Sequence, residues 1–177
     1  MKISEILMGY KTDKAREHSY GPFYDVLFSK FDRNAPIRIL ELGVQGGGSL
    51  LAWKEAFPNA TVIGVDISDS RHDEYKRPDL VTFIKSDLRE MPIDVEAEFD
   101  VIIDDSDHFL GTQLFILKNY YPFLAPGGYL VIEDVQNPEW DVNEISKVLP
   151  ESAKMMITDL REQKGRPDDF LITIIAP

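Results

Sequence analysis

The sequence predicts an α/β fold in which helices cover a single doubly wound, mostly parallel sheet that ends in a C-terminal antiparallel hairpin strand. Three observations support this prediction. Apolar runs typical of buried strands alternate with segments of helical character. A glycine-rich turn follows the first of these strands. The last two strands are separated only by a Gly/Pro-containing loop, which leaves room for a hairpin but not for a crossover helix.

The elements follow in order after an N-terminal helical segment, residues 1–31, which Gly21-Pro22 is expected to interrupt. The polar residues 68–79 contain Pro78 and predict a loop with at most a short helix. The acidic stretch after Leu88 has no clear periodicity. Ala125-Pro126-Gly127-Gly128 should end the predicted helix Thr112–Leu124 that precedes this sequence. In the Rossmann-like core, residues 32–177, the predicted strands are Ile37–Leu42, Thr61–Ile67, Val81–Lys85, Phe99–Asp104, Tyr129–Glu133, Ala153–Leu160 and Phe170–Ile175, and the helices are Ser49–Phe57, Thr112–Leu124 and Asn143–Leu149.

The composition restricts the class of protein. A chain of 177 residues fits one domain, residues 1–177, and the absence of cysteine excludes disulfides and thiolate metal sites. The net charge of -12, with no basic cluster, argues against a nucleic-acid partner. No signal peptide or membrane-spanning apolar run is visible, so a cytoplasmic protein without membrane attachment is expected.

The first strand and the glycine-rich turn predict a nucleoside site. Glu41 precedes Gly43, further glycines follow at Gly46 to Gly48, and the next strand carries Asp66 near its end. Glycines let backbone N–H groups approach a ligand, and a carboxylate at a strand end can accept both hydroxyls of a ribose. The simpler alternatives are a tight turn for the glycines and a helix cap for the carboxylate.

A second set of polar residues follows the fourth and fifth strands. Asp104, Asp105, Asp107 and His108 come after one strand, and Glu133-Asp134 after the other, so the fold should bring them together at one sheet edge. Converging carboxylates without a Lys or Arg partner would repel one another unless a divalent cation lay among them. Oxygen ligands favour Mg²⁺. Alternatively, Glu133-Asp134 faces solvent without an ion, His108 is an ordinary polar residue, and Asp107 caps the helix that begins near Phe109.

From about Asp32 to Pro177 the chain resembles the class I S-adenosylmethionine-dependent methyltransferases, whose first motif is a Glu-x-Gly loop and whose sheet ends in an antiparallel hairpin. The glycine spacing and the lack of a Tyr-x-x-x-Lys pair disfavour the alternative, a nicotinamide-dependent oxidoreductase or epimerase. The resemblance implies the following cofactor-binding residues: Lys14, Tyr20, Glu41, Gly43, Ser49, Asp66, Ile67, Asp87, Leu88 and Asp104. Of these, Asp66 would take the ribose, Ile67, Asp87 and Leu88 the adenine, and Asp104 the sulfonium region.

The acidic pattern narrows this resemblance to the metal-dependent macrolide-sugar O-methyltransferases of the mycinamicin and tylosin type. The resemblance implies that Asp105, Glu133 and Asp134 hold Mg²⁺ and that His108 is the general base. It extends to Thr12-Asp13-Lys14 and the segment from His18 to Tyr24, which in that family precedes the first strand and closes over the cofactor.

The resemblance also implies the acceptor: a small hydroxylated molecule, either a sugar or a glycosylated polyketide from antibiotic biosynthesis. Trp140 is a candidate wall of the acceptor pocket, and a second copy of the chain could complete that pocket in a homo-oligomer. Two further functions stay open. One is a catechol-type methyltransferase acting on an aromatic hydroxyl, and the other is a binding module with a decayed active site.

Overall fold

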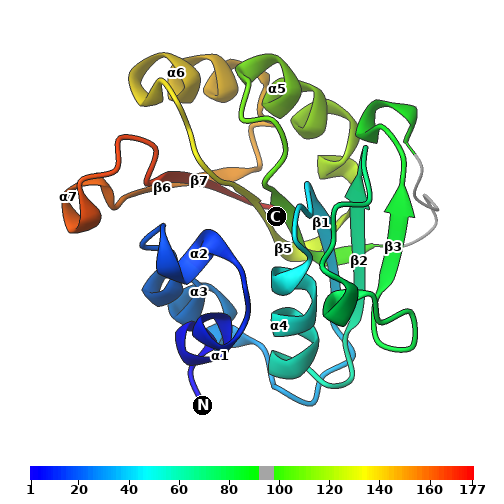
Figure 1. Cartoon of the computed structure of the whole chain (residues 1–177). Coiled ribbons are helices and arrows are strands. Elements are labelled where there is room, and N and C mark those ends of the chain that lie inside the picture. Colours follow the sequence, from blue (N-terminus) through cyan, green and yellow to red (C-terminus); the bar gives the residue numbers. More distant parts are fainter. Residues whose placement is uncertain (92–97) are drawn as a thin grey trace.

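The computed structural model describes residues 1–91 and 98–177, and its centre is one seven-stranded sheet (Figure 1). The strand order β3-β2-β1-β4-β5-β7-β6 confirms the predicted doubly wound α/β fold. β1 to β5 run parallel, β7 is antiparallel to β5, and β6 is antiparallel to β7. The strands are β1 Arg38–Leu42, β2 Thr61–Asp66, β3 Thr82–Lys85, β4 Phe99–Asp104, β5 Leu124–Ile132, β6 Lys154–Asp159 and β7 Phe170–Ile175.

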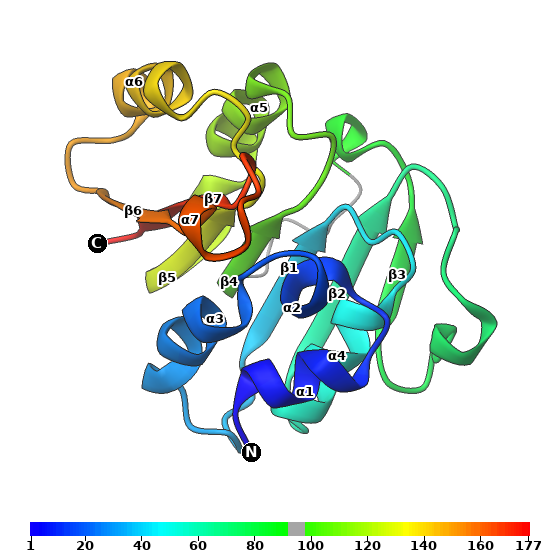
Figure 2. The ribbon, with the colours of Figure 1, turned by 60° about the vertical axis from the view of Figure 1, so that its left-hand side comes forward.

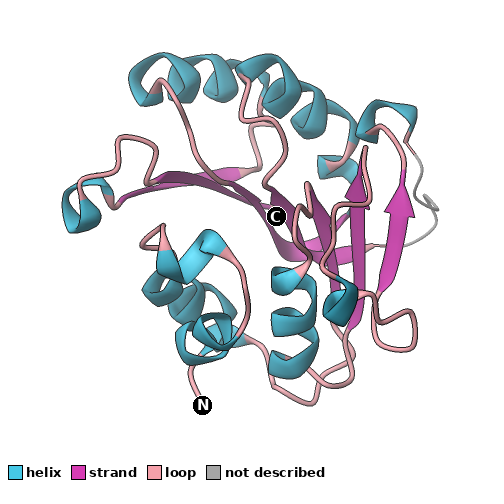
Figure 3. Cartoon of the chain, in the orientation of Figure 1, coloured by secondary structure: helices cyan, strands magenta, loops and turns pink. Residues whose placement is uncertain are grey.

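Helices cover both faces of this sheet (Figures 1 and 3). The helix α4 Gly48–Ala56 lies on one face, and α5 Leu110–Asn119 and α6 Pro138–Val148 lie on the other. Successive strand residues point to opposite faces, so β4 supplies both layers. Val101 and Ile103 join the core beneath α4, whereas Ile102 joins the core beneath α5 and α6. Burial on both faces explains why these strands appear in the sequence as continuous apolar runs.

The N-terminal segment packs beside α4 on the same face of the sheet (Figure 2). It contains α1 Ile3–Gly9, α2 Asp13–Arg16 and α3 Gly21–Leu27, with the 3₁₀ turn η1 Phe28–Lys30 after them. The expectation that Gly21-Pro22 interrupts a helix is wrong, because these residues begin α3. Proline fits the first helical turn, where its missing N–H costs no hydrogen bond.

Several element boundaries differ from the prediction. The Ala125-Pro126-Gly127-Gly128 sequence lies inside β5, where the β4–β5 register shifts between the pairs Phe99–Leu124 and Val101–Tyr129, so the breaker forms a bulge. The predicted helix Thr112–Leu124 starts earlier, as α5 at Leu110, and ends at Asn119, followed by η4 Tyr121–Phe123. α6 begins five residues before the predicted start, at Pro138.

The remaining connections agree with the expected loops. The polar loop after β2 contains only η2 Asp73–Tyr75, and η3 Leu88–Glu90 follows β3. Most of the acidic stretch after η3 lies outside the described residues. The hairpin between β6 and β7 contains one short helix, α7 Arg161–Lys164. In the part of the chain that the structure describes, no helix is long and apolar enough to cross a membrane.

Candidate active site

The glycine turn after β1 is pressed against the chain that leaves β4. Gly43 has φ +88°, and a Cβ atom built on it would lie 2.0 Å from the carbonyl oxygen of Asp105. Only glycine fits such a backbone and such an approach. The carboxyl ends of β1 and β4 are paired here, with the N–H of Asp105 donating to the carbonyl oxygen of Leu42 at 2.8 Å, and Gly43 lines a pocket at this sheet edge.

That pocket is lined by several of the residues predicted to bind a nucleoside. Gly43, Asp66, Ile67 and Leu88 all line it, together with Ser106 and Asp107, which the prediction did not include. Ile67 is 70% exposed. The Asp87 carboxylate accepts a hydrogen bond from the backbone N–H of Arg89 and so caps η3 beside the pocket.

Asp66 holds the glycine turn in place. One carboxylate oxygen accepts hydrogen bonds from the backbone N–H groups of Val44 at 2.9 Å and Gln45 at 3.0 Å. The other accepts from the N–H of Ser68 at 2.9 Å. Burial acts to raise the pKa of Asp66, but these donors outweigh it and the pKa is lowered. Asp66 therefore stabilises the glycine turn. Its contact with a ribose stays a prediction.

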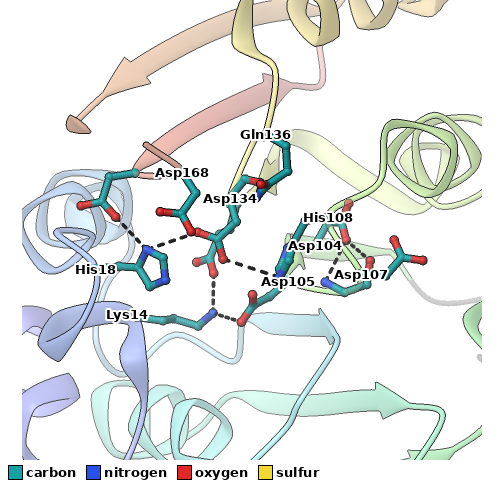
Figure 4. Close-up of polar contacts among 12 residues, drawn as sticks. Lys14, His18, Asp104, Asp105, Asp107, His108, Asp134, Gln136 and Asp168 are labelled. Atoms are coloured by element: carbon teal, nitrogen blue, oxygen red, sulfur yellow. Dashed lines mark hydrogen bonds and ion pairs between the residues drawn. The ribbon is translucent and has the colours of Figure 1, made fainter. Parts of the chain in front are cut away.

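The acidic cluster at the ends of β4 and β5 contains a lysine (Figure 4). Lys14 Nζ lies 2.6 Å from Oδ2 of Asp105, 2.5 Å from Oε2 of Glu133 and 3.4 Å from Oε1 of Glu41. The expectation of converging carboxylates without a Lys or Arg partner is therefore wrong. Burial would lower the pKa of Lys14, but Asp105, Glu133 and Glu41 outweigh it and hold that pKa well above its usual value.

Glu133 and Asp134 are both buried, and tyrosines from the N-terminal segment bind them. The hydroxyl of Tyr24 donates to Glu133, and the hydroxyl of Tyr20 donates to Asp134. Burial and the charge of Asp105 raise the pKa of both carboxyls. Lys14 acts in the opposite direction on Glu133, and Tyr20 does so on Asp134, but both effects are outweighed. The alternative that both face solvent is wrong, because they are 2% and 5% exposed.

His108 lies at the open side of this cluster. Its Nε2 is 3.8 Å from Oδ2 of Asp134, and one donor atom from each of Asp105, His108 and Asp134 lies within 4.8 Å of the others. His108 and Asp134 have φ values of 59° and 53°. Left-handed backbone at non-glycine residues costs free energy and is found most often where function fixes a side chain.

Five residues of the predicted cofactor set have side chains that turn away from the pocket. Lys14 and Tyr20 enter the acidic cluster. Glu41 is fully buried, where it accepts from Trp53 Nε1 at 2.7 Å and bonds the Ser49 hydroxyl. Asp104 is 2% exposed and accepts from the Ser106 hydroxyl at 2.6 Å. A buried charge needs hydrogen-bonding partners, and one oxygen of Glu41 and one of Asp104 have them in Trp53 and Ser106.

The sequence analysis did not predict that His18 and Asp169 pack behind Asp134. His18 Nδ1 lies 2.7 Å from Oδ1 of Asp169 and 3.3 Å from Oδ1 of Asp134. The His18 ring also stacks on Tyr20. Asp169 belongs to the loop before β7 and is fully buried. In the sequence, the aromatic segment from His18 to Tyr24 was the one indication of these contacts. No feature of the sequence near Asp169 indicated them.

Three exposed residues follow the ends of β4 and β5. The Asp107 carboxylate accepts from the Phe109 N–H at 3.2 Å and from the Thr112 hydroxyl at 2.9 Å, so it ties down the start of α5 from outside the N-cap position. Trp140, in the first turn of α6, is 62% exposed, and Phe109 is 71% exposed. Trp140 remains a predicted pocket wall, and Phe109 is an aromatic neighbour that the prediction did not include.

The donor set of the acidic cluster fits a hard divalent cation. Glu41, Asp105 and Glu133 face the ammonium of Lys14, and Asp134 lies beside Asp105 and His108. Burial first, and then the charge of Asp105, raise the pKa values of Glu133 and Asp134. Carboxylate oxygens are the ligands that Mg²⁺ prefers, and a cation would relieve the repulsion.

Comparison with known proteins assigns the class of this domain. Residues 40–135 match the family described as methyltransferase domain, which covers more than half of the chain. The chain therefore belongs to the methyltransferase domain family. This result favours the methyltransferase prediction over the nicotinamide-dependent alternative.

Several similar curated proteins are named as O-methyltransferases. The chain is 34% identical over 149 residues to 8-demethyl-8-alpha-L-rhamnosyl tetracenomycin-C 2'-O-methyltransferase of Streptomyces olivaceus, with 78% of this chain and 39% of that protein covered. It is 33% identical to demethylmacrocin O-methyltransferase of Streptomyces fradiae, covering 78% and 37%. It is 34% identical to mycinamicin VI 2''-O-methyltransferase of Micromonospora griseorubida, again covering 78% and 37%. The chain thus spans less than half the length of these relatives.

Solved structures share the fold. The MycE methyltransferase from the mycinamycin biosynthetic pathway, in complex with Mg, SAH and mycinamycin VI, has a TM-score of 0.74 at 23% identity, covering 98% of this chain and 53% of that chain. The SAH-bound Podospora anserina methyltransferase PaMTH1 has a TM-score of 0.65 at 18% identity, covering 99% and 86%. At these identities the likeness supports the Rossmann-like methyltransferase fold alone.

Proposed function

We propose that this chain is an S-adenosylmethionine-dependent and Mg²⁺-dependent O-methyltransferase domain whose acceptor is a hydroxyl on the sugar of a glycosylated natural product. The observation that carries the proposal is the position of His108. It lies beside Asp105 and Asp134, at the same sheet edge as the pocket lined by Gly43, Ile67 and Leu88. The similarity to three sugar O-methyltransferases supports the choice of acceptor.

Different residues of the site would bind the methyl donor and the cation. The turn at Gly43 and the carboxylate of Asp66 would hold the nucleoside part of the methyl donor in the pocket. Asp105, Glu133 and Asp134 would hold the cation. A bound divalent cation supplies positive charge that favours the alkoxide form of a nearby alcohol.

His108 acts on the acceptor. Its side chain is partly exposed, so an acceptor hydroxyl can reach it from solvent, and its Nε2 would take the hydroxyl proton. The same oxygen then forms a bond to the methyl carbon as the bond between that carbon and sulfur breaks. Orientation of the two reactants by the rigid strand ends supplies much of the rate enhancement.

An aliphatic acceptor is favoured over a catechol. An aliphatic hydroxyl is a much weaker acid than a phenol, so it requires a dedicated base, and His108 lies where such a base is needed. The assignment of Gly43, Asp66, Ile67, Asp87 and Leu88 to the cofactor, assembly into homo-oligomers and an acceptor pocket walled by Trp140 are part of this proposal.

The test is a methyl-transfer assay with S-adenosylmethionine and glycosylated acceptors such as mycinamicin VI and demethylmacrocin, analysed by mass spectrometry. We expect product that carries one added methyl group, loss of turnover in EDTA, and recovery when Mg²⁺ is added. Methylation of a catechol but of no glycosylated acceptor would contradict the acceptor class. Undiminished turnover in EDTA would contradict the metal dependence.

A further inference from the structure

Lys14 is the feature of the site that the proposed function leaves unexplained. Its side chain is 1% exposed, and its ammonium lies 2.6 Å from Asp105 and 2.5 Å from Glu133. Both carboxylates belong to the set proposed to hold the cation. Mg²⁺ binds oxygen at about 2.0–2.1 Å. A divalent ion held by the same two oxygens, Oδ2 of Asp105 and Oε2 of Glu133, would therefore occupy the space that Nζ fills.

Two cations cannot share that position. An ammonium and a divalent ion a few ångströms apart repel each other strongly in a buried environment. Since the Lys14 side chain is enclosed by protein, it cannot leave the carboxylates by a simple rotation into solvent. Withdrawal of Nζ therefore requires α2, which carries Lys14, to shift.

The segment that would shift also contacts the glycine turn. Three residues before Lys14, the carbonyl oxygen of Lys11 lies so close to Gly48 that a Cβ atom there would be 2.5 Å from it. The backbone N–H of Lys11 donates to the Tyr75 hydroxyl at 2.9 Å. Residues 11–14 thus extend from the glycine turn to the acidic cluster, and movement at one end reaches the other.

Resting on the proposed function, we infer that Lys14 is an internal counter-cation that competes with the divalent metal for Asp105 and Glu133. In the metal-free protein its ammonium holds the two carboxylates together and docks α2 over the site. Metal entry displaces the ammonium and releases α2. Metal loading and the closure of the N-terminal segment are thereby coupled.

The experiment measures Mn²⁺ binding by electron paramagnetic resonance, in which free and bound ions are counted directly and no turnover is needed. Lys14→Met removes the charge at nearly constant length, and Lys14→Gln removes the charge but keeps N–H donors. We expect both variants to bind Mn²⁺ about tenfold more tightly than the unmodified chain. Lys11→Met is the matched control, because that lysine is exposed, pairs with Glu74 at the surface and should leave metal affinity unchanged.

Hydrogen exchange provides a second measurement. The N–H groups of Glu17 and His18 both donate to the carbonyl oxygen of Asp13, and that of Tyr20 donates to the carbonyl oxygen of Lys14. We expect Mg²⁺ to speed exchange at these three amides in the unmodified chain. If a Lys14 variant folds only when Mg²⁺ is present, that result also supports competition.

The outcomes separate the two proposals. Equal or weaker Mn²⁺ binding in both Lys14 variants, with clear binding in the unmodified chain, overturns the competition and leaves the proposed function intact. Slower exchange at the amides of Glu17, His18 and Tyr20 on metal binding also overturns it. An absence of metal binding in every variant overturns the metal dependence itself, and the competition falls with it.

Discussion

The indole Nε1 of Trp53 donates to Oε2 of Glu41 at 2.7 Å, and both side chains are fully buried. This bond joins α4 to the end of β1 directly beneath the acidic cluster. The same glutamate lies 3.4 Å from Lys14 Nζ, so the bond also fixes one wall of the cluster. A buried carboxylate that loses a donor costs more than a solvated one, because water cannot replace the donor.

We therefore expect Trp53→Phe to destabilise the protein by about 1–3 kcal/mol, from the unpaired buried oxygen alone. The matched control is Trp140→Phe, because Trp140 is 62% exposed and its replacement should change stability little. Urea denaturation followed by circular dichroism measures both. Equal unfolding midpoints for the two variants would show that the Glu41 bond carries no net free energy.

Gly43→Ala should prevent correct closure of the site. The new Cβ would lie 2.0 Å from the Asp105 carbonyl oxygen, at a φ of +88°. We expect a loss of at least about 2 kcal/mol in stability and loss of S-adenosylhomocysteine binding by calorimetry. Gly111→Ala is the control, since a Cβ there meets nothing within 4 Å in the first turn of α5, and it should stabilise by about 0.5–1 kcal/mol. A Gly43→Ala variant with normal stability would contradict the close approach.

Asp104→Asn should change how stability depends on pH. Burial raises the pKa of Asp104 from 3.8 to about 6, so the folded state binds this proton more tightly than the unfolded state. The contribution is full below about pH 4 and is lost as the pH rises through about 6. Asparagine carries no such charge, so the variant should gain about 2–3 kcal/mol relative to the unmodified chain between pH 4.5 and 7.5. Urea titrations at the two pH values measure this difference, and a difference independent of pH would contradict it.

His108→Asn should reduce methyl transfer by about 10²–10⁴ while leaving cofactor affinity unchanged, because only the base is removed. Asparagine tolerates the left-handed backbone at this position, where φ is 59°, better than most residues. His72→Gln is the control, since His72 lies in the polar loop after β2 and is exposed. A parallel fall in cofactor affinity for His108→Asn would assign His108 to binding instead.

The sequence predicts the parts of the fold that depend on local patterns. Apolar runs such as Phe99–Asp104 identify strands because a parallel strand is buried on both faces. The short connection before Phe170 correctly predicted an antiparallel end to the sheet. Element boundaries were less predictable. A bulge at Ala125–Gly128 and a helix start at Pro138 depend on neighbours distant in the chain.

The site was predictable only in its outline. Strand ends converge in every sheet of this type, so the meeting of Asp105 with Glu133-Asp134 follows from topology. The lysine between them does not, because Lys14 is 91 residues from Asp105 in the chain and 119 from Glu133. Nothing near Lys14 in the sequence distinguishes a buried ammonium from a solvated one.

The insertion of β7 between β5 and β6 restricts the order in which the polypeptide can become structured. During synthesis, residues 154–159 emerge before residues 170–175, and among the strands that the structure describes β7 is their one hydrogen-bonded neighbour. Until that later stretch leaves the ribosome, the earlier one has no strand with which to pair. The outer hairpin of the sheet therefore forms only after residues 170–175 have been synthesised.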